Sequence, residues 1–174
     1  LYNASAQMLD AEWVPVRTGT DMALMFAIAY EMLRLDEEKG GIVDWDFIHK
    51  YTVGFDSESM PEDKTIDENL KDYILGKYDG TPKTPEWAEP ICGVKPEQIT
   101  ELAQIMAKNN KVMILHNYGM ARCNGAEMLP QLLIALGAMG GHMGKSGHAT
   151  ASAYHANAGN GGARLISAGT AKMP

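Results

Sequence analysis

Residues 112–116 read Val112-Met113-Ile114-Leu115-His116, four apolar residues and a histidine between polar neighbours. A continuous apolar run of this length is typical of a strand buried on both faces of a parallel sheet. A loop follows, and then a helix is expected over residues 126–139, with Pro130 in its first turns. The apolar residues of this helix share one stripe: Leu129, Leu132, Leu133 and Leu136. Together these residues predict a strand–loop–helix unit.

A second unit of the same kind precedes it in the chain. Residues 11–16 contain aromatic and β-branched residues and a proline, which predicts a short strand at the edge of a sheet. The loop Arg17-Thr18-Gly19-Thr20 comes next. A helix is then expected from Asp21, with Thr20 or Thr18 as its N-cap, and its apolar residues cover most of its circumference. The two units predict an α/β fold, a three-layer αβα domain with a mostly parallel, Rossmann-like sheet.

Two further helices and a peripheral region complete the expected fold. The first helix is expected to have Thr84 as its N-cap, Pro85 as its first residue and Gly93 as its end. The second is expected to begin at Pro96 and to end at Asn109-Asn110. Residues 36–72 hold 12 acidic and four basic residues, so short helices and solvated loops are expected there.

Composition excludes several functional classes. The formal net charge is −7 and no Lys/Arg cluster exists, so nucleic-acid binding is not expected. The longest apolar run, residues 22–30, is nine residues long and too short to cross a membrane as a helix. The two cysteines, Cys92 and Cys123, form neither a disulfide framework nor a metal-ligand motif.

The last 38 residues, 137–174, contain nine glycines and no acidic residue. A segment of this composition is not expected to form a separate layer of the fold by itself. We expect a domain over residues 1–150 and a Gly/Ala-rich, extended tail over residues 151–174. The chain starts at Leu1 and ends in this tail, so a piece of a longer protein is expected, one that exposes apolar surface and self-associates.

The loops after the two expected strands are the candidate ligand-binding segments. In open α/β sheets, ligands lie beyond the carboxyl ends of the strands, next to helix N-termini. The first loop offers the cation of Arg17, close backbone approach at Gly19, a hydroxyl at Thr20 and the carboxylate of Asp21. That carboxylate either accepts paired N–H donors from a guanine edge or stabilises the start of its own helix. The residues alone leave both roles open.

Other motifs are absent or incomplete. Gly144-Lys145-Ser146 matches the end of a P-loop, but Met139 stands where the first glycine is required, and no hydrolase or zinc-protease motif occurs. His142, His148 and His155 lack metal-ligand spacing, so they are expected to be polar or core histidines. His116 is the last residue of the expected strand. Its side chain either has a structural role through hydrogen bonds or faces a ligand.

Five segments occur in a recognisable order. Residues 11–24, which include Trp13-Val14-Pro15-Val16-Arg17-Thr18-Gly19-Thr20-Asp21, resemble A-D-x-W-x-P-x-R-P-G-T-D-x-A-L, with Thr18 in place of its second Pro. Residues 46–55 contain F-I-x-K-Y-x-x-G-F/Y. Residues 84–94 match T-P-x-W-A followed by G-I/V. Residues 118–127 and 140–147 resemble G-x-x-R-x-x-N-G-E and T-G-N-I-G-K-P-G-G. In order and spacing these segments resemble the molybdopterin oxidoreductases, the dimethyl sulfoxide reductase family.

The resemblance implies a part of a catalytic subunit that holds two molybdopterin guanine dinucleotides around one molybdenum and reduces a small substrate such as dimethyl sulfoxide. It implies two sets of cofactor-binding residues. The first loop would hold a guanine dinucleotide end, and the second would approach the pterin: Arg17, Gly19, Thr20 and Asp21, and Tyr118, Gly119, Met120 and Arg122. The family's iron–sulfur cysteines and molybdenum ligand lie upstream, so the chain by itself is expected to be inactive and free of cofactor.

The resemblance also implies partners and a location: the rest of the catalytic subunit, an iron–sulfur electron-transfer subunit, a membrane anchor, and the periplasm. Two other readings of the residues remain. One is a stand-alone α/β module that binds a nucleotide or a protein partner without redox function. The other is a scaffold whose Gly-rich tail docks on a partner.

Overall fold

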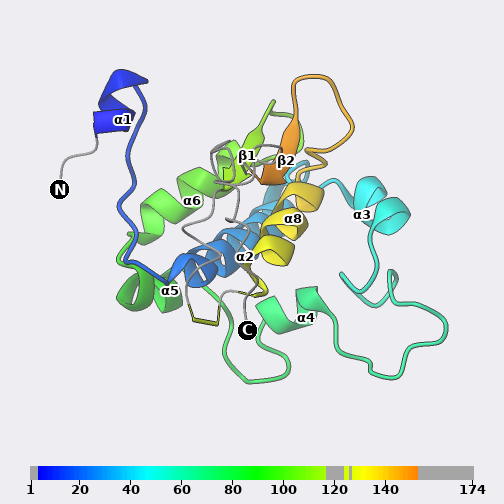
Figure 1. Cartoon of the computed structure of the whole chain (residues 1–174). Coiled ribbons are helices and arrows are strands. Elements are labelled where there is room, and N and C mark those ends of the chain that lie inside the picture. Colours follow the sequence, from blue (N-terminus) through cyan, green and yellow to red (C-terminus); the bar gives the residue numbers. More distant parts are fainter. Residues whose placement is uncertain (1–3, 117–123, 126, 153–174) are drawn as a thin grey trace, which may run out of the picture.

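The computed structural model of the chain describes residues 4–116, 124–125 and 127–152. Its helices and strands, in chain order, are α1 (Ala4–Met8), α2 (Asp21–Lys39), α3 (Trp45–Tyr51), α4 (Leu70–Ile74), α5 (Pro85–Cys92), α6 (Pro96–Ile105), β1 (Met113–His116), α8 (Leu129–Met139) and β2 (Ala149–Ser152). Figure 1 shows α2 in the middle, with α5, α6 and α8 around it. Among these described helices, none has the length and apolar character needed to cross a membrane.

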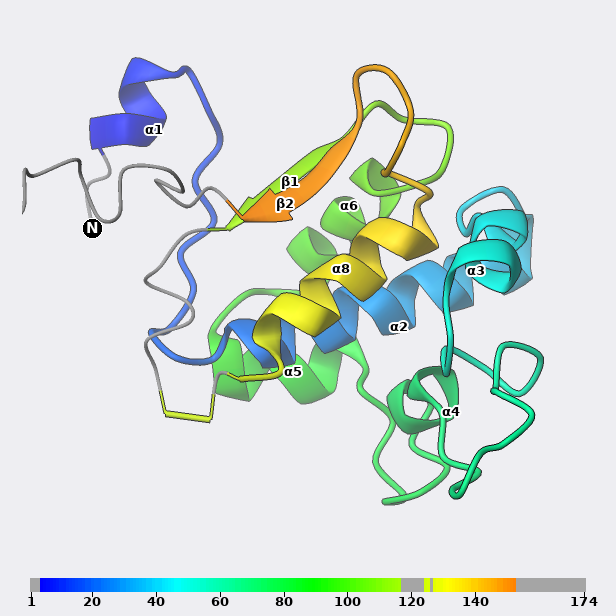
Figure 2. The same cartoon turned by 45° about the vertical axis from the view of Figure 1, so that its right-hand side comes forward.

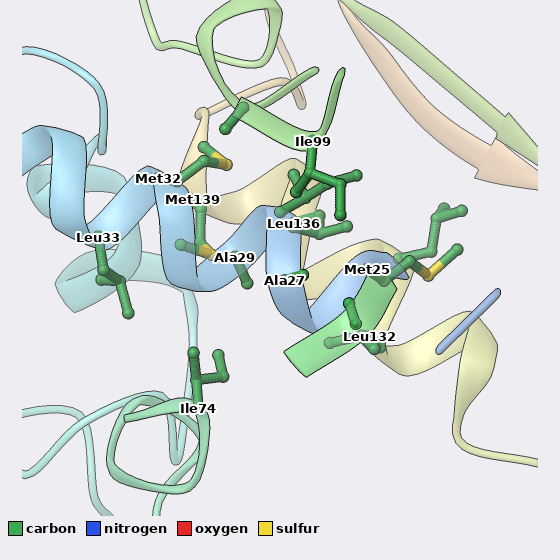
Figure 3. Packing of buried hydrophobic residues seen from close by; sticks show 14 of the residues in the cluster. Met25, Ala27, Ala29, Met32, Leu33, Ile74, Ile99, Leu132, Leu136 and Met139 are labelled. Atoms are coloured by element: carbon green, nitrogen blue, oxygen red, sulfur yellow. The ribbon is translucent and has the colours of Figure 1, made fainter. Parts of the chain in front are cut away.

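Helix α2 is the centre of the hydrophobic core. Its buried apolar side chains point in several directions, as expected for a helix that is apolar around most of its circumference. Figure 3 shows Ile99 of α6, Leu136 of α8 and Ile74 of α4 gathered around it, and all three are fully or almost fully buried. Burying one such side chain contributes about 1.5–3 kcal/mol. Packing around α2 therefore holds the helices of the chain together.

Local capping explains where the helices next to α2 begin and end. Thr84 Oγ1 accepts a hydrogen bond from the N–H of Trp87 (3.1 Å), and Gly93 closes α5 in the left-handed conformation, as expected. Helix α6 opens at Pro96 as expected but ends at Ile105, earlier than Asn109. The Nδ2 of Asn110 donates to the carbonyls of Gln104 and Ile105 (both 3.0 Å), so it caps the helix from beyond its end.

The acidic region is peripheral, as the sequence predicts. It holds the short helices α3 and α4 with loops between them. One of its acidic residues has a structural role, because Asp36 accepts hydrogen bonds from the N–H groups of Ile42 (2.8 Å) and Val43 (3.0 Å) and from Nε1 of Trp45 (2.8 Å). These three donors fix the chain reversal between α2 and α3.

The strands form a parallel pair with α8 as the crossover helix. Met113 pairs with Ala149 and His116 with Ser152, and the α/β class and parallel pairing are therefore confirmed. Strand β2 was not foreseen, because residues 149–152 were assigned to the Gly-rich C-terminal region. The rest of the expected tail, residues 153–174, lies outside the described residues.

The expectation that β1 is buried on both faces is wrong for the described part of the chain. Exposure alternates along the strand: Ile114 and His116 are buried, whereas Met113 is 61% and Leu115 is 54% exposed. Figure 2 shows α6 and α8 on one side of the strand pair, which explains the buried positions. The opposite face carries apolar side chains without a helix from the described residues over it.

The expected strand over residues 11–16 is also wrong. This segment runs as irregular chain and pairs with no described strand. Pro15 has no N–H to donate, and Trp13 is 37% exposed, so neither ladder bonds nor burial favours a strand here. The segment is instead attached at its end, where the N–H of Arg17 donates to the carbonyl of Cys92 (3.0 Å).

Candidate cofactor-binding site

The two candidate loops leave the same end of the fold. In Figure 2, the arrowheads of β1 and β2 and the first turns of α2 and α8 lie on the same, left-hand side of the molecule. This is the arrangement in which α/β proteins bind ligands, because helix N-termini present free N–H groups there. The first loop follows irregular chain and not a strand, so the expectation that both loops lie at the carboxyl edge of one sheet stays a prediction.

The first loop, residues 17–20, is a tight turn that leads into α2. The N–H of Thr20 donates to the carbonyl of Arg17 (3.2 Å), and Thr20 Oγ1 donates to the same carbonyl (2.7 Å). Gly19 adopts φ +80°, and no described atom lies within 4 Å of the position that a Cβ would take. A ligand can therefore approach this backbone closely, although a side chain would be strained at this φ.

The side chain of Arg17 does not point freely into a binding site. Its Nη1 donates to the carbonyl of Ile91 (3.1 Å) and also to that of Pro90, in the last turn of α5. The cation thus satisfies carbonyls that a helix end leaves free and complements its negative pole. Sequence reasoning missed this role, although Gly93 signals a helix end with free carbonyls.

Asp21 starts α2 and forms no hydrogen bond or ion pair with the residues that the structure describes. Thr20 occupies the N-cap position as expected, but its hydroxyl bonds to Arg17 and does not cap the helix. The first helical bonds run from Ala23 (3.0 Å) and Leu24 (3.4 Å) to the carbonyl of Thr20. The earlier N–H groups, of Asp21 and Met22, therefore have no carbonyl partner within the helix.

The positive end of a 19-residue helix thus lies together with a carboxylate that has no partner among the described residues. The N–H groups favour an anion such as a diphosphate, and the carboxylate accepts paired N–H donors. A guanine nucleotide supplies both partners.

The second set of candidate residues, Tyr118, Gly119, Met120 and Arg122, lies outside the described residues. Its flanks are described: His116 ends β1 and is buried (5% exposed) on the face toward the helices. Gly125, before α8, adopts φ +74°. The buried position favours the structural role of His116 over a ligand-facing one.

Metal ligands and reactive thiols are not assembled in the described part of the chain. It contains no group of three or more His, Cys, Asp or Glu side chains that could hold a metal ion. Cys92 is a buried free thiol, as expected, and Cys123 lies outside the described residues. His142 is fully buried, which fits the expected core histidine.

A groove along α8 was not foreseen from the sequence. Two adjoining hollows of about 520 and 380 Å³ share the lining residues Thr52, Ile134 and Ala138. Ile134 is 52% exposed and lies outside the leucine stripe, which is the only sequence signal for this second apolar face. The groove is mostly apolar and carries no set of polar groups for a charged cofactor.

Comparison with known proteins gives the family. No family model matches the chain. It is 37% identical over 165 residues to trimethylamine-N-oxide reductase of Haemophilus influenzae, a match of 95% of this chain and 18% of the relative. Dimethyl sulfoxide reductase DmsA of Escherichia coli is 34% identical over 139 residues, 79% of this chain and 16% of the relative. The chain corresponds to an internal segment of proteins of the dimethyl sulfoxide reductase family.

A third relative extends the match within this family. Dimethyl sulfoxide/trimethylamine N-oxide reductase of Rhodobacter capsulatus is 32% identical over 155 residues, which cover 89% of this chain and 17% of the relative. The resemblance seen in the sequence motifs is therefore confirmed. The chain spans less than a fifth of the length of these three relatives.

Proposed function

We propose that this chain is the cofactor-binding part of a molybdenum-dependent oxidoreductase that reduces a small substrate such as dimethyl sulfoxide. The cofactor is molybdopterin guanine dinucleotide, two molecules of which hold one molybdenum. The observation that carries the proposal is the carboxylate of Asp21, which lies beside the first N–H groups of α2 and has no side-chain partner in the described part of the chain. The similarity to dimethyl sulfoxide and trimethylamine N-oxide reductases supports it.

The residues of the first loop fit a guanine dinucleotide. Asp21 would accept the N–H donors of the guanine edge, while the backbone at Gly19 and Thr20 would contact the nucleotide. Arg17 would act mainly by fixing the loop against α5, because its Nη1 is engaged by backbone carbonyls. The second loop, with Tyr118, Gly119, Met120 and Arg122, would approach the pterin, as the family resemblance implies.

The bound molybdenum cofactor would supply oxygen-atom and electron transfer to the substrate. The residues of this chain bind and orient the nucleotide end, and the described part contains no group of three or more side chains that could hold a metal ion. Iron–sulfur and molybdenum ligands would come from other parts of the parent protein. The chain by itself is therefore proposed to be inactive and free of cofactor.

The three-layer fold would be completed by the parent protein. Met113 and Leu115 leave an exposed apolar face on β1, whereas a sheet in a doubly wound fold has helices on both faces. Further strands and a second helical layer would cover this face. Residues 1–150 would form the α/β domain, and residues 151–174 would run as a Gly/Ala-rich segment along neighbouring parts.

The parent would work with partners. By analogy with the family, these are the remainder of the catalytic subunit, an iron–sulfur electron-transfer subunit and a membrane anchor. The proposed location is the periplasm, with membrane association through the partner subunits.

The proposal is tested by the cofactor content of the longer protein that carries this segment, purified without oxygen. The expected result is about two guanine nucleotides released per molybdenum atom, because each molybdenum is held by two dinucleotides. Well-folded protein with neither component would contradict the proposal and favour an α/β module without redox function.

The role of Asp21 is tested in the same protein by Asp21→Asn. An amide places a donor where two acceptors are needed, so guanine nucleotide retention should fall about tenfold or more. Asp46→Asn is the matched control, because Asp46 is also the acidic residue in the first turn of its helix, α3. Equal retention in the two variants would show that Asp21 only stabilises the helix start.

A further inference from the structure

His142 is a fully buried histidine in the loop between α8 and β2. Its Nε2 lies 2.9 Å from the carbonyl oxygen of Met106, just beyond α6. Its Nδ1 lies 3.1 Å from Nδ1 of His148, and the two rings stack at 18° with 5.3 Å between their centroids. Both nitrogens of the buried ring therefore have a defined partner.

These two contacts dictate where the protons lie. A carbonyl oxygen only accepts, so Nε2 of His142 must donate its proton to Met106. In the neutral ring, Nδ1 of His142 is then an acceptor and Nδ1 of His148 is the donor. His148 can gain a proton at Nε2 without losing this bond. A proton added at Nδ1 of His142 removes this bond only when His148 also carries a proton on both nitrogens, because a neutral His148 can hold its proton at Nε2 and accept at Nδ1.

The ring of His142 has little room to turn away. A Cβ on Gly140 would come within 2.2 Å of Nε2 of His142 and 2.5 Å of the Met106 carbonyl, so only glycine permits this approach. The loop runs directly into the sheet: Thr150 Oγ1 donates to the carbonyl of His142 (3.2 Å), and the N–H of Ala149 donates to that of Val112 (3.1 Å). Movement of the ring must therefore move the start of β2.

Several charges surround the pair. Asp44 and Lys145 form an ion pair (2.9 Å) next to the loop. Lys108, after α6, acts on Asp44, and the side chain of Lys111, before β1, lies along Gly147. Burial lowers the pKa of His142 below its usual value of 6.5, and the charges of His148 and Lys145 lower it further. The Met106 carbonyl and Asp44 act in the opposite direction, but burial prevails.

We propose that the hydrogen bond between His142 and His148 is a pH-dependent latch that holds β2 on β1. The latch is closed while His142 is neutral, and it opens when His142 takes up a second proton beside a His148 that already carries one on both nitrogens. Because the pKa of His142 is lower in the closed state than in an open, solvated one, closing is favoured above pH 6.5 and progressively lost below it. This inference does not depend on the proposed function.

The latch is tested by hydrogen exchange of the Ala149 amide in this chain, corrected for the intrinsic effect of pH. Its protection should fall about tenfold per pH unit below 6.5, as for one proton taken up on opening. The amide of Ile28, in the middle of α2, should keep its protection over the same range. Constant protection at Ala149, or an equal loss at Ile28, would overturn the latch.

His148→Gln is the decisive variant, because the amide oxygen of Gln accepts a hydrogen bond from protonated His142. The loss of Ala149 protection in acid should shrink to about twofold or less. His49→Gln is the matched control, since His49 pairs with Asp56 and Glu58, far in sequence from the loop, and should keep the wild-type response. An unchanged response in His148→Gln would contradict the proposal.

A measurement on the wild-type chain covers the case in which the variant fails to fold. Nitrogen NMR at neutral pH should show His142 protonated only at Nε2 and His148 protonated at Nδ1. The opposite assignment at either ring would overturn the proposed latch.

Discussion

Nη1 of Arg17 donates to the carbonyl oxygen of Ile91 at 3.1 Å, and this bond joins the segment before α2 to the last turn of α5. The backbone of Arg17 adds a second tie through its N–H and the carbonyl of Cys92 (3.0 Å). Gly93 lies beside this contact, and its φ of +80° favours glycine at this position. The candidate nucleotide loop is thus positioned by a helix that lies about 70 residues away in sequence.

Arg17→Ala should lower the free energy of unfolding by about 1 kcal/mol, because exposed hydrogen bonds to helix-end carbonyls contribute modestly. Arg17→Lys should recover part of this loss, since it keeps the charge without the planar fork. Denaturant unfolding of the three proteins measures the effect. Identical midpoints for Arg17→Ala and wild type would show that the contact has no energetic role.

Glu31→Ala should destabilise the chain by about 2 kcal/mol, because the hydrogen bonds from Arg34 and Thr100 to its buried carboxylate are lost. The Glu31 side chain is 3% exposed and accepts bonds from Arg34 Nη2 (2.6 Å) and Thr100 Oγ1 (2.9 Å). Glu38→Ala is the control, since Glu38 also contacts Arg34 but is exposed, and it should cost less than about 0.5 kcal/mol. Thermal or denaturant unfolding measures the loss of stability in both variants. Equal losses would refute the expectation that Glu31 contributes more than Glu38.

The same carboxylate predicts a pH dependence of stability. Hydrogen bonding from Arg34 lowers the pKa of Glu31 below its usual 4.5, although burial opposes the change. Its contribution is therefore present above pH 4.5 and is lost as the pH falls below that value. The stability difference between wild type and Glu31→Gln should shrink on acidification below pH 4.5, as followed by denaturant titrations at each pH. A difference that stays constant down to acid pH would contradict this origin.

Gly140→Ala should cost about 3 kcal/mol, because its Cβ would collide with His142 and with the Met106 carbonyl. The backbone at Gly140 (φ −85°) accepts any residue, so the loss would report crowding alone. Gly54→Ala supplies the contrast: φ is +78° and no described atom lies within 4 Å, so backbone strain of about 1 kcal/mol is expected. Differential scanning calorimetry of both variants checks the order, and the reverse order would exclude the close contact.

The chain should self-associate through the open face of its sheet, where Leu115 is 54% exposed. Leu115→Lys should shift sedimentation velocity profiles toward the monomer. Ile105→Lys is the control, because Ile105 is 50% exposed on α6, away from that face. Monomeric wild-type chain at high concentration would remove the basis of this prediction.

The bounds of α5 show that the local sequence is sufficient to predict where this helix begins and ends. Thr84, Pro85 and Gly93 determine the bounds of that helix, because an N-cap hydroxyl and a left-handed glycine act within a few residues. The leucine stripe of α8 is buried as expected for the same reason, since its spacing defines one face. The residues of the candidate site in the first loop were also named from the sequence and its resemblance, and their cofactor role stays a prediction.

Predictions of strands were less reliable, because a strand depends on partners elsewhere in the chain. Residues 11–16 have strand-forming residues but no partner strand among the described residues. Residues 149–152 lie in a Gly-rich context and nevertheless form β2, because β1 supplies a parallel edge. Likewise, the apolar residues of β1 predict a strand. They do not show which face of that strand the described helices cover.

The sequence by itself determined the presence of α2, α5, α6 and α8, the class of fold and the family, because periodicity, capping residues and motif order are properties of neighbouring positions. Only the tertiary structure decided that Arg17 caps α5, that β1 pairs with β2, and that His142 meets His148 and Met106. These contacts join groups that are distant in the chain or depend on how a loop is packed. Their geometry follows from the packing of helices around α2, which no local pattern encodes.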